Sequence, residues 1–140
     1  MAVYAPNEDN PAFFLDFFDH LTDFKGDDII MGGDYNLVLD LDKDQRGGLA
    51  KTHQNSVKII HEFSEELDLV DVWRVLHPDT SGFTRRHRPR MQCRLDSFLV
   101  SQSTVNITTL TDIVPGYKTD HSACYAYHHI QIHADQVSGN

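Results

Sequence analysis

The sequence has 140 residues, of which 40% are hydrophobic and 24% are charged, and this balance predicts one globular domain. The net charge of −9 argues against a generally basic nucleic-acid-binding protein. Cys93 and Cys124 are isolated, which excludes a Cys-x-x-Cys zinc or redox motif, so we expect an intracellular setting. No apolar stretch approaches the roughly 20 residues of a membrane span, and we expect no membrane partner.

Strand and helix signals alternate in the first half of the chain. Residues 2–5 predict a short strand, and Asn10 followed by Pro11 is typical of a helix N-terminus. Residues 28–31 form an apolar run that predicts a buried strand. The predicted helix carries a core-facing apolar stripe made of Phe13, Phe14, Phe17, Phe18, Leu21 and Phe24, with Gly26 just past its end.

Beyond residue 40 the signals become shorter. Residues 40–52 predict a polar loop, and a second amphipathic helix follows, with Val57, Ile60, Phe63 and Leu67 on one face. Turn residues then separate strand-like runs over 69–73, 82–84, 94–101, 107–114 and 122–132. Helices interleaved with short strands predict an α/β layered fold, with sheets packed together and helices on the outside.

An acidic triplet in the polar loop imitates a calcium-binding loop. Asp40, Asp42 and Asp44 have the spacing that starts an EF-hand. The sixth and twelfth positions, however, are Gln45 and Lys51, where that site needs Gly and Glu. We therefore expect a solvated loop here.

The segment 85–94 reverses the acidic character of the chain, because it holds five arginines and no acidic residue. If these arginines neutralise phosphates, nucleic-acid affinity falls steeply with salt. The alternative, a solvated hairpin tip, is equally compatible with the sequence. The candidate nucleic-acid-binding residues are Arg85, Arg86, Arg88 and Arg90.

Two acidic signatures carry the chemistry that the sequence suggests: the first is Gly-Gly-Asp-Tyr-Asn (32–36) and the second is Lys-Thr-Asp-His-Ser (118–122). Phosphodiester cleavage by water needs a divalent cation, a base for the nucleophile and donors to the charged transition state. A carboxylate beside an amide in one signature, and a carboxylate beside an imidazole in the other, supply such groups. Each signature lies where a strand is predicted to end, and a lone Gly-Gly-Asp is often only a turn, so their joint occurrence carries the argument. The candidates are Asp34, Asn36, Asp120 and His121, with Asp96 and Tyr4 in addition.

Several sequence blocks resemble the endonuclease/exonuclease/phosphatase superfamily, and they are most similar to the apurinic-type endonuclease domain of LINE-type non-LTR retrotransposons. The resemblance runs from about Val3 to about Tyr127. The Asp-Val-Trp-Arg block with the following His-Pro favours the retrotransposon branch over repair enzymes or phosphatases. The blocks are Val-Tyr-Ala-Pro-Asn (3–7), Met-Gly-Gly-Asp-Tyr-Asn (31–36), Leu-Val-Asp-Val-Trp-Arg (69–74), His-Pro (77–78), Phe-Thr (83–84), Arg-Leu-Asp-Ser-Phe (94–98) and Thr-Asp-His-Ser (119–122).

The resemblance implies a fold and a metal. The expected fold is a partial four-layered α/β sandwich, in which two packed, mainly antiparallel sheets are flanked by helices and the N-terminal strands are missing. Residues 1–140 would form this single, N-terminally truncated domain. The implied cofactor is Mg²⁺, with Mn²⁺ as the alternative, and the implied metal-binding residues are Asp34, Asn36, Asp120 and His121.

The resemblance also implies roles in the reaction. Asp34 would activate the attacking water or protonate the leaving oxygen, and Asn36 would position the scissile phosphate. Tyr4 would touch that phosphate. His121 would contact the phosphate or serve as base, held in orientation by Asp96.

The chain departs from the family at its start. In the family an early Asn and a metal-binding Glu precede the Tyr-Ala-Pro-Asn block with which this chain begins, so we expect a truncated copy or a partial gene model that is inactive alone. The implied function is a DNA-nicking endonuclease of a retrotransposon-derived protein, with DNA as partner, a reverse transcriptase domain in a longer parent, and a nuclear location if it acts on chromosomal DNA. The alternatives are a superfamily phosphatase acting on a lipid or inositol phosphate, and a non-catalytic remnant.

Overall fold

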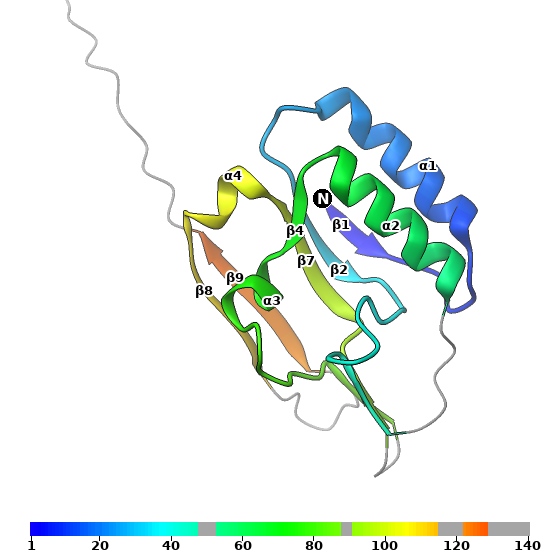
Figure 1. Ribbon diagram of the computed structural model, residues 1–140, viewed down its shortest axis with the longest axis vertical. Helices are drawn as coiled ribbons and strands as arrows, with labels where there is room; N and C mark the ends of the chain where they lie inside the picture. The colour runs from blue at the N-terminus through cyan, green and yellow to red at the C-terminus, as the bar shows by residue number, and fades with distance from the viewer. Residues whose placement is uncertain (48–52, 88–90, 115–121, 129–140) are drawn as a thin grey trace, which may run out of the picture.

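A four-stranded sheet forms the centre of the structure, a computed structural model that describes residues 1–47, 53–87, 91–114 and 122–128. The strand order is β1-β2-β7-β4, with β1 parallel to β2 and the other neighbours antiparallel (Figure 1). The bounds are β1 Ala2–Tyr4, β2 Ile30–Asp34, β4 Leu69–Asp71 and β7 Asp96–Ser101. Three of the segments with predicted site residues therefore lie on neighbouring strands.

Two helices, α1 (Pro11–Leu21) and α2 (Gln54–Glu66), cover one face of this sheet (Figure 1). Helix α1 begins as predicted, because the Asn10 side chain accepts a hydrogen bond from the Phe13 N–H at 3.0 Å and a proline occupies the first turn. A short 3-10 turn, Thr22–Phe24, follows it. The rings of Phe18 and Phe63 stack with their centroids 5.0 Å apart and join the two helices. The predicted amphipathic helices are thus confirmed, but the apolar stripe is wrong at Phe24, which lies in the 3-10 turn and is 52% exposed.

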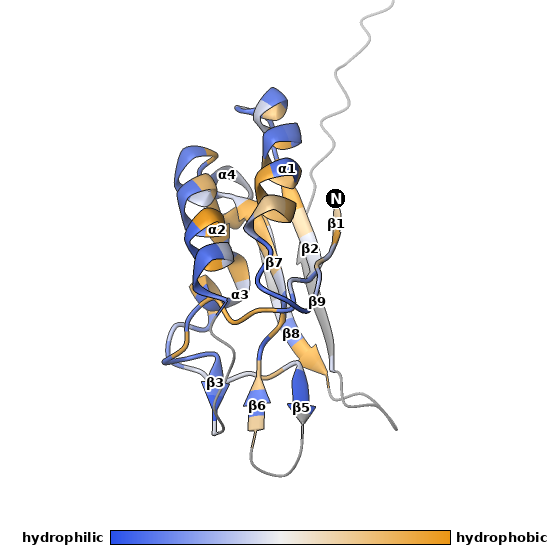
Figure 2. Cartoon of the chain, turned by 90° about the vertical axis from the view of Figure 1, so that its right-hand side faces the viewer, coloured by the Kyte–Doolittle hydropathy of each residue, from blue (hydrophilic) through white to orange (hydrophobic). Residues whose placement is uncertain are grey.

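Alternate strand residues divide the sheet into a face that the helices cover and an opposite face, part of which the β8–β9 pair covers at β7 (Figure 2). Val3, Met31 and Leu99 belong to the buried core cluster that includes the apolar side chains of α1 and α2. Full burial of such a side chain contributes about 1.5–3 kcal/mol. Because successive residues of a strand point to opposite faces, Tyr4 and Asp34 lie on the face that the helices do not cover.

The first turn of α2 is capped by a distant residue. Its own N-cap residue, His53, makes no side-chain cap bond. Instead, the Asp9 carboxylate accepts hydrogen bonds from the Ser56 hydroxyl at 2.5 Å, the Ser56 N–H at 3.0 Å and the Asn55 side chain at 3.1 Å. These bonds, the one from the Ser56 hydroxyl foremost, lower the pKa of Asp9. Asp9 thereby ties the segment before α1 to the start of α2.

Two smaller sheets and two short helices complete the described structure. Strand β8 (Thr108–Val114) pairs antiparallel with β9 (Ala123–His128), and β9 contacts β7. Strands β3 (Gln45–Arg46), β6 (Met91–Cys93) and β5 (Arg85–His87) form an antiparallel sheet in that order, called the small sheet below. Helices α3 (Val72–Leu76) and α4 (Gln102–Val105) directly follow β4 and β7. The predicted α/β class is confirmed, and no helix within the described ranges is long and apolar enough to cross a bilayer.

A buried ionic network joins the main sheet to the small sheet. Arg94 is 2% exposed and lies between β6 and β7. Its Nε and Nη2 atoms each donate a 2.9 Å hydrogen bond to the Asp44 carboxylate, and the same guanidinium pairs with Asp71 at the end of β4. Arg74 adds a second cation, 2.5 Å from Asp44. Two guanidinium groups thus neutralise two carboxylates.

An aromatic ring and hydrogen bonds support the network. The Arg94 and Arg74 guanidinium groups lie 5.1 and 4.9 Å from the centroid of the Trp73 ring. Burial alone lowers the pKa of Arg94, but the hydrogen bonds to Asp44 and Asp71 outweigh it, and the net shift is upward. Arg94 is therefore charged across the working pH range.

This network explains where the predicted elements are wrong. A strand is predicted over 69–73, but β4 ends at Asp71, whose carboxylate accepts the Arg74 N–H at 3.3 Å and caps α3. The acidic loop is not solvated throughout, because Asp44 is 1% exposed as the partner of Arg94. The last arginine of the basic segment is likewise buried and cannot contact phosphate.

Other boundaries differ because of packing. Residues 82–84, predicted as a strand, precede β5 instead, and a Cβ atom on Gly82 would lie 2.5 Å from the Trp73 ring. The predicted loop 40–52 contains β3. The end of the predicted strand 122–132 lies outside the described residues.

Removal of the Arg94 charge should destabilise the fold strongly. Arg94→Met leaves Asp44 and Asp71 without their shared cation, and breaking a buried ion pair costs about 3–5 kcal/mol. We expect a loss of this size in the free energy of unfolding, measured by urea denaturation. The matched variant Arg86→Met removes an exposed arginine from the same region and should change stability by no more than about 0.5 kcal/mol. Equal stability of the two variants would contradict the assignment.

The Asp9 cap should make stability depend on pH in the acid range. Because folding lowers the pKa of Asp9 from 3.8, its ionised form stabilises the native state above that value, and the contribution is lost as the pH falls through the lowered pKa. We expect Asp9→Asn to melt below the wild type at neutral pH. The difference in melting temperature should shrink below about pH 4. A difference that grows on acidification would disprove the cap.

Candidate active site

Three predicted site residues form one row across the main sheet. Tyr4 on β1 is the register partner of Asp34 on β2, and Asp34 is the partner of Asp96 on β7. Register partners on neighbouring strands point to the same side of a sheet. Tyr4 is 82% exposed, while Asp34 and Asp96 are half-buried. The row thus presents a phenol and two carboxylates on the face opposite the helices.

Two glycines allow β1, β2 and β7 to approach at this row. Gly33 has a φ of +150°, and a Cβ atom there would lie 2.0 Å from the Val3 carbonyl oxygen. A Cβ on Gly32 would lie 2.3 Å from the Phe98 ring. A side chain at Gly33 would therefore push β1 away from β2, and one at Gly32 would collide with the Phe98 ring, which explains the Gly-Gly before Asp34.

The turn after β2 fixes Asn36 beside Asp34. The Asn36 N–H donates a 2.8 Å hydrogen bond to Asp34 Oδ1, and Asn36 has a φ of +50°, which asparagine tolerates better than most residues. Its side-chain Nδ2 donates to the Ala5 carbonyl at 2.5 Å. The turn in which the Asp34 carboxylate accepts a backbone N–H, an Asx turn, is therefore present, as a purely structural role of Gly-Gly-Asp predicts. The same turn orients the Asn36 side-chain amide that the proposed chemistry requires.

Thr84 connects the row to the second acidic signature. It is fully buried, and its hydroxyl oxygen accepts hydrogen bonds from the N–H groups of Leu95 at 2.9 Å and Asp96 at 3.1 Å. The Ser122 N–H donates a 2.6 Å hydrogen bond to the Thr84 carbonyl. Asp120 and His121 lie outside the described residues, but Ser122, the next residue, is tied through Thr84 to the start of β7. Chemical reasoning from the sequence missed Thr84, and the Phe-Thr block was its only signal.

An open depression adjoins the row on the face of the sheet opposite the helices. It encloses about 650 Å³, and its floor is formed by Ala2, Ile30, Gly32 and Phe98, with Asp96 and Ser122 also lining it. The depression therefore combines an apolar floor with Asp96 from the row and with Ser122, the described residue of the second signature.

The electrostatics of the row favour a cation. Two carboxylates at directly opposed strand positions lie about 5 Å apart at their Cβ atoms and repel each other. Burial raises the pKa of the nearby Cys93 thiol, the Arg85 charge opposes this shift, and the negative charges of Asp34 and Asp96 add to it. Hard carboxylate and amide oxygens suit Mg²⁺, which typically takes one or two carboxylates from the protein. The donor set of Asp34, Asp96 and Asn36 thus fits such an ion, although no cluster of three His, Cys, Asp or Glu side chains occurs among the described residues.

The predicted phosphate-contacting arginines are divided between two faces. Arg85 and Arg86 are successive residues of β5, so they point to opposite sides of the small sheet. Arg86 is exposed and Arg85 is half-buried. Arg88 and Arg90 lie outside the described residues. The two described arginines cannot face the same phosphates.

Comparisons with known proteins agree with this geometry. None of the protein-family profiles matches the chain. Over 107 residues, 72% of its length, the chain is 32% identical to the transposon TX1 uncharacterized 149 kDa protein of Xenopus laevis. It superposes on an AP endonuclease from Archaeoglobus fulgidus with a TM-score of 0.75 and 15% identity. It superposes on the 3′ phosphatase NExo from Neisseria, bound to a product DNA hairpin, with a TM-score of 0.71 and 18% identity.

The coverage of these matches is unequal. Each superposition uses 92% of this chain but only 60% of the solved structure. The chain spans 8% of the transposon protein. The structural likeness confirms the predicted fold, which this chain represents in part, and the transposon match is consistent with the predicted retrotransposon branch.

Substitution of Gly33 should disturb the row more than substitution of a glycine in open space. Gly33→Ala combines an unfavourable φ, about 1–2 kcal/mol, with a collision against Val3, for which overpacking costs about 1–3 kcal/mol. The matched variant Gly26→Ala also has a positive φ, +96°, but no atom lies within 4 Å of the added Cβ. We expect thermal unfolding to show the larger loss for Gly33→Ala. If Gly26→Ala is destabilised equally, the close approach of β1 is not the reason for a glycine at position 33.

Proposed function

We propose that this chain, a partial domain with the AP endonuclease/exonuclease-phosphatase fold, is part of a metal-dependent phosphodiesterase that nicks DNA in a retrotransposon-derived protein. The observation that carries the proposal is the row of Tyr4, Asp34 and Asp96 on one open face of the sheet. Asn36 adjoins this row through its bond to Asp34. These groups match the chemical requirements of phosphodiester hydrolysis.

Each residue of the row has a defined task in this proposal. Asp34 takes the proton of the attacking water or returns one to the leaving oxygen, and the hydrogen bond from the Asn36 N–H leaves its second oxygen for this purpose. The Asn36 amide positions the scissile phosphate, and the exposed Tyr4 hydroxyl donates to a phosphoryl oxygen. A bound Mg²⁺ would offset charge on that phosphate, and among the described residues Asp34 and Asn36 would hold it.

The second signature supplies the remaining groups. We place His121 at the phosphate as donor or base, and Asp120 as a further metal-binding carboxylate. The bond from Ser122 to Thr84 supports this placement, because it brings the residue after His121 to the strand that carries Asp96. In this arrangement Asp96 orients the imidazole and fixes its tautomer.

DNA is the substrate that the comparisons favour. One structural neighbour is named an AP endonuclease, and another is bound to a product DNA hairpin. The match to 8% of a transposon protein favours a longer parent protein. We further propose that this parent carries a reverse transcriptase domain and acts in the nucleus. We further propose that the 140-residue chain alone does not cleave DNA, since it spans 60% of the superposed nuclease.

Magnesium-dependent nicking of supercoiled plasmid tests this function. We expect no nicking by the 140-residue chain, and nicking by a longer form of the parent protein that contains it. In the longer form, Asp34→Ala and His121→Ala should each lower the rate by about 100-fold or more, the range of general acid–base catalysis.

The control variant for this experiment is Asp42→Ala, which removes an exposed carboxylate of the acidic loop and should leave the rate unchanged. Nicking by the 140-residue chain at the rate of the longer form would refute the proposed inactivity. Failure of the longer form to nick DNA with either metal would refute the nuclease assignment itself.

A further inference from the structure

The outer face of the small sheet carries a row of cationic and polar side chains. Arg46 on β3 is the register partner of Gln92 on β6, and Gln92 is the partner of Arg86 on β5. The three side chains therefore share one face. We call this set the Arg46–Gln92–Arg86 row.

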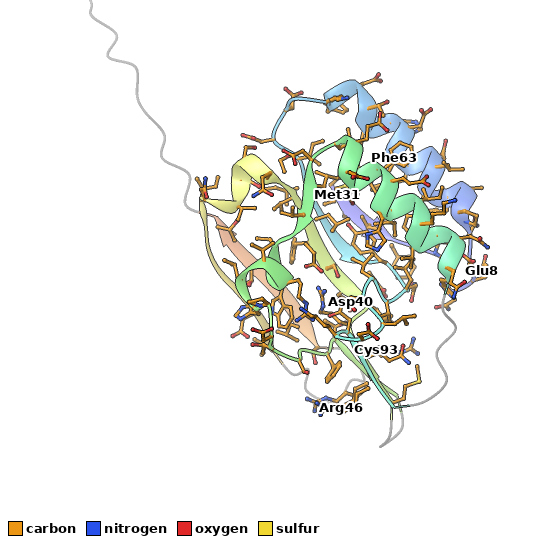
Figure 3. All side chains as sticks on the ribbon, viewed as in Figure 1. Glu8, Met31, Asp40, Arg46, Phe63 and Cys93 are labelled. Atoms are coloured by element: carbon orange, nitrogen blue, oxygen red, sulfur yellow. The ribbon has the colours of Figure 1, made fainter. Side chains whose placement is uncertain are left out.

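Burial shows which face of the small sheet is outer. The preceding register set, Gln45, Cys93 and Arg85, points the other way, and Cys93 is 3% exposed in a cluster with Val38 and Leu95. In contrast, Arg46 and Arg86 are exposed. Figure 3 shows Arg46 at the margin of the molecule and Cys93 further inside.

The charge of this face is opposite to that of the chain. The protein carries a net charge of −9, yet the row holds two arginines and no acid. Figure 2 shows β3 and β5 in hydrophilic colours. The other arginines of this region differ, because Arg74 and Arg94 are neutralised inside the protein by Asp44 and Asp71.

The row is also held in a fixed position. The Arg46 guanidinium lies 5.6 Å from the centroid of the half-buried Phe83 ring. The backbone N–H of Arg94 donates a 2.9 Å hydrogen bond to the Asp44 carbonyl, next to the start of β3. Since Arg94 and Leu95 alone separate β6 from Asp96, the small sheet is anchored at the end of the main sheet where the candidate active site lies.

The spacing suits a polyanion. Two strand spacings separate Arg46 from Arg86, about 9–10 Å at the backbone, and each arginine can reach a different phosphate. The Gln92 amide between them is a further donor of the kind that contacts phosphate oxygens. A single small anion would not occupy both arginines.

We propose that the Arg46–Gln92–Arg86 row is a second contact surface for DNA, which grips phosphates of the duplex beside the cleavage site. The inference rests on the proposed function and adds β3 to the surface. It assigns the half-buried Arg85 to the inner face, away from these phosphates. The row positions the DNA and does not take part in bond cleavage.

Salt-dependent binding of the 140-residue chain to a duplex oligonucleotide tests the row, measured by fluorescence anisotropy without Mg²⁺. Each neutralised phosphate contributes about 0.9 to the slope of log affinity against log salt, so Arg46→Gln and Arg86→Gln should each lower the slope by about 0.9 and the double variant by about 1.8. When salt is raised fourfold, the affinity of a variant that has lost one contact should fall by a factor about 3.5 times smaller than the wild-type affinity does. Arg46→Lys, which keeps the charge, should retain the wild-type slope.

The matched control is Lys25→Gln, which removes one exposed positive charge directly after the 3-10 turn that follows α1. Figure 2 shows α1 and the small sheet at opposite ends of the molecule. Its slope should stay at the wild-type value. If the double variant has the same slope as this control while the wild type binds DNA, the row is not a contact surface, and the proposed function survives. If the wild type binds no DNA at low salt, the contact surface is overturned, and nicking by the longer form alone decides the proposed function. If the slopes change as expected but the longer form nicks no plasmid, the contact surface stands without the nuclease.

Discussion

The burial of one guanidinium between two carboxylates is the constraint on which the structure depends. Arg94 leaves the small sheet, pairs with Asp44 before β3 and with Asp71 at the end of β4, and is followed by the strand that carries Asp96. A buried charge of this kind is tolerated only when its partners are fully in place. The loop after β2, the turn into α3 and the start of β7 must therefore form together.

The candidate active site inherits its geometry from this constraint. The row of Tyr4, Asp34 and Asp96 requires β2 and β7 in one register, and the network fixes the residue two positions before Asp96. Thr84 adds a second restraint at the same place by accepting the Leu95 and Asp96 N–H groups. Catalytic groups must be held within about 0.5 Å of their productive positions, and restraints of this kind help to hold them there.

The features that the sequence reveals are those with local causes. The Asn10 cap, the helical phenylalanine stripe and the Gly-Gly-Asp-Tyr-Asn turn follow from residues close together in the chain. The partners of Arg94 lie 50 and 23 residues away in the sequence. The residues next to Arg94 therefore give no sign that it is buried, and it looks like one more surface arginine. Thr84 could not be found by chemical reasoning for a similar reason, since a buried hydroxyl that binds the amides of distant residues leaves no periodic pattern in the sequence. Tyr4, Asp34 and Asp96 could be chosen from motif resemblance, but only strand register brings them into one row.

The remote cap on α2 bears on how the domain folds. Asp9 lies 47 residues before Ser56, so the first turn of α2 gains its acceptors only after the chain segment ahead of α1 has arrived. A helix of this length is marginal in isolation. The two helices should consequently form and open as one cooperative unit. The amides of α2 should exchange with solvent as soon as the N-terminal segment that carries Asp9 detaches.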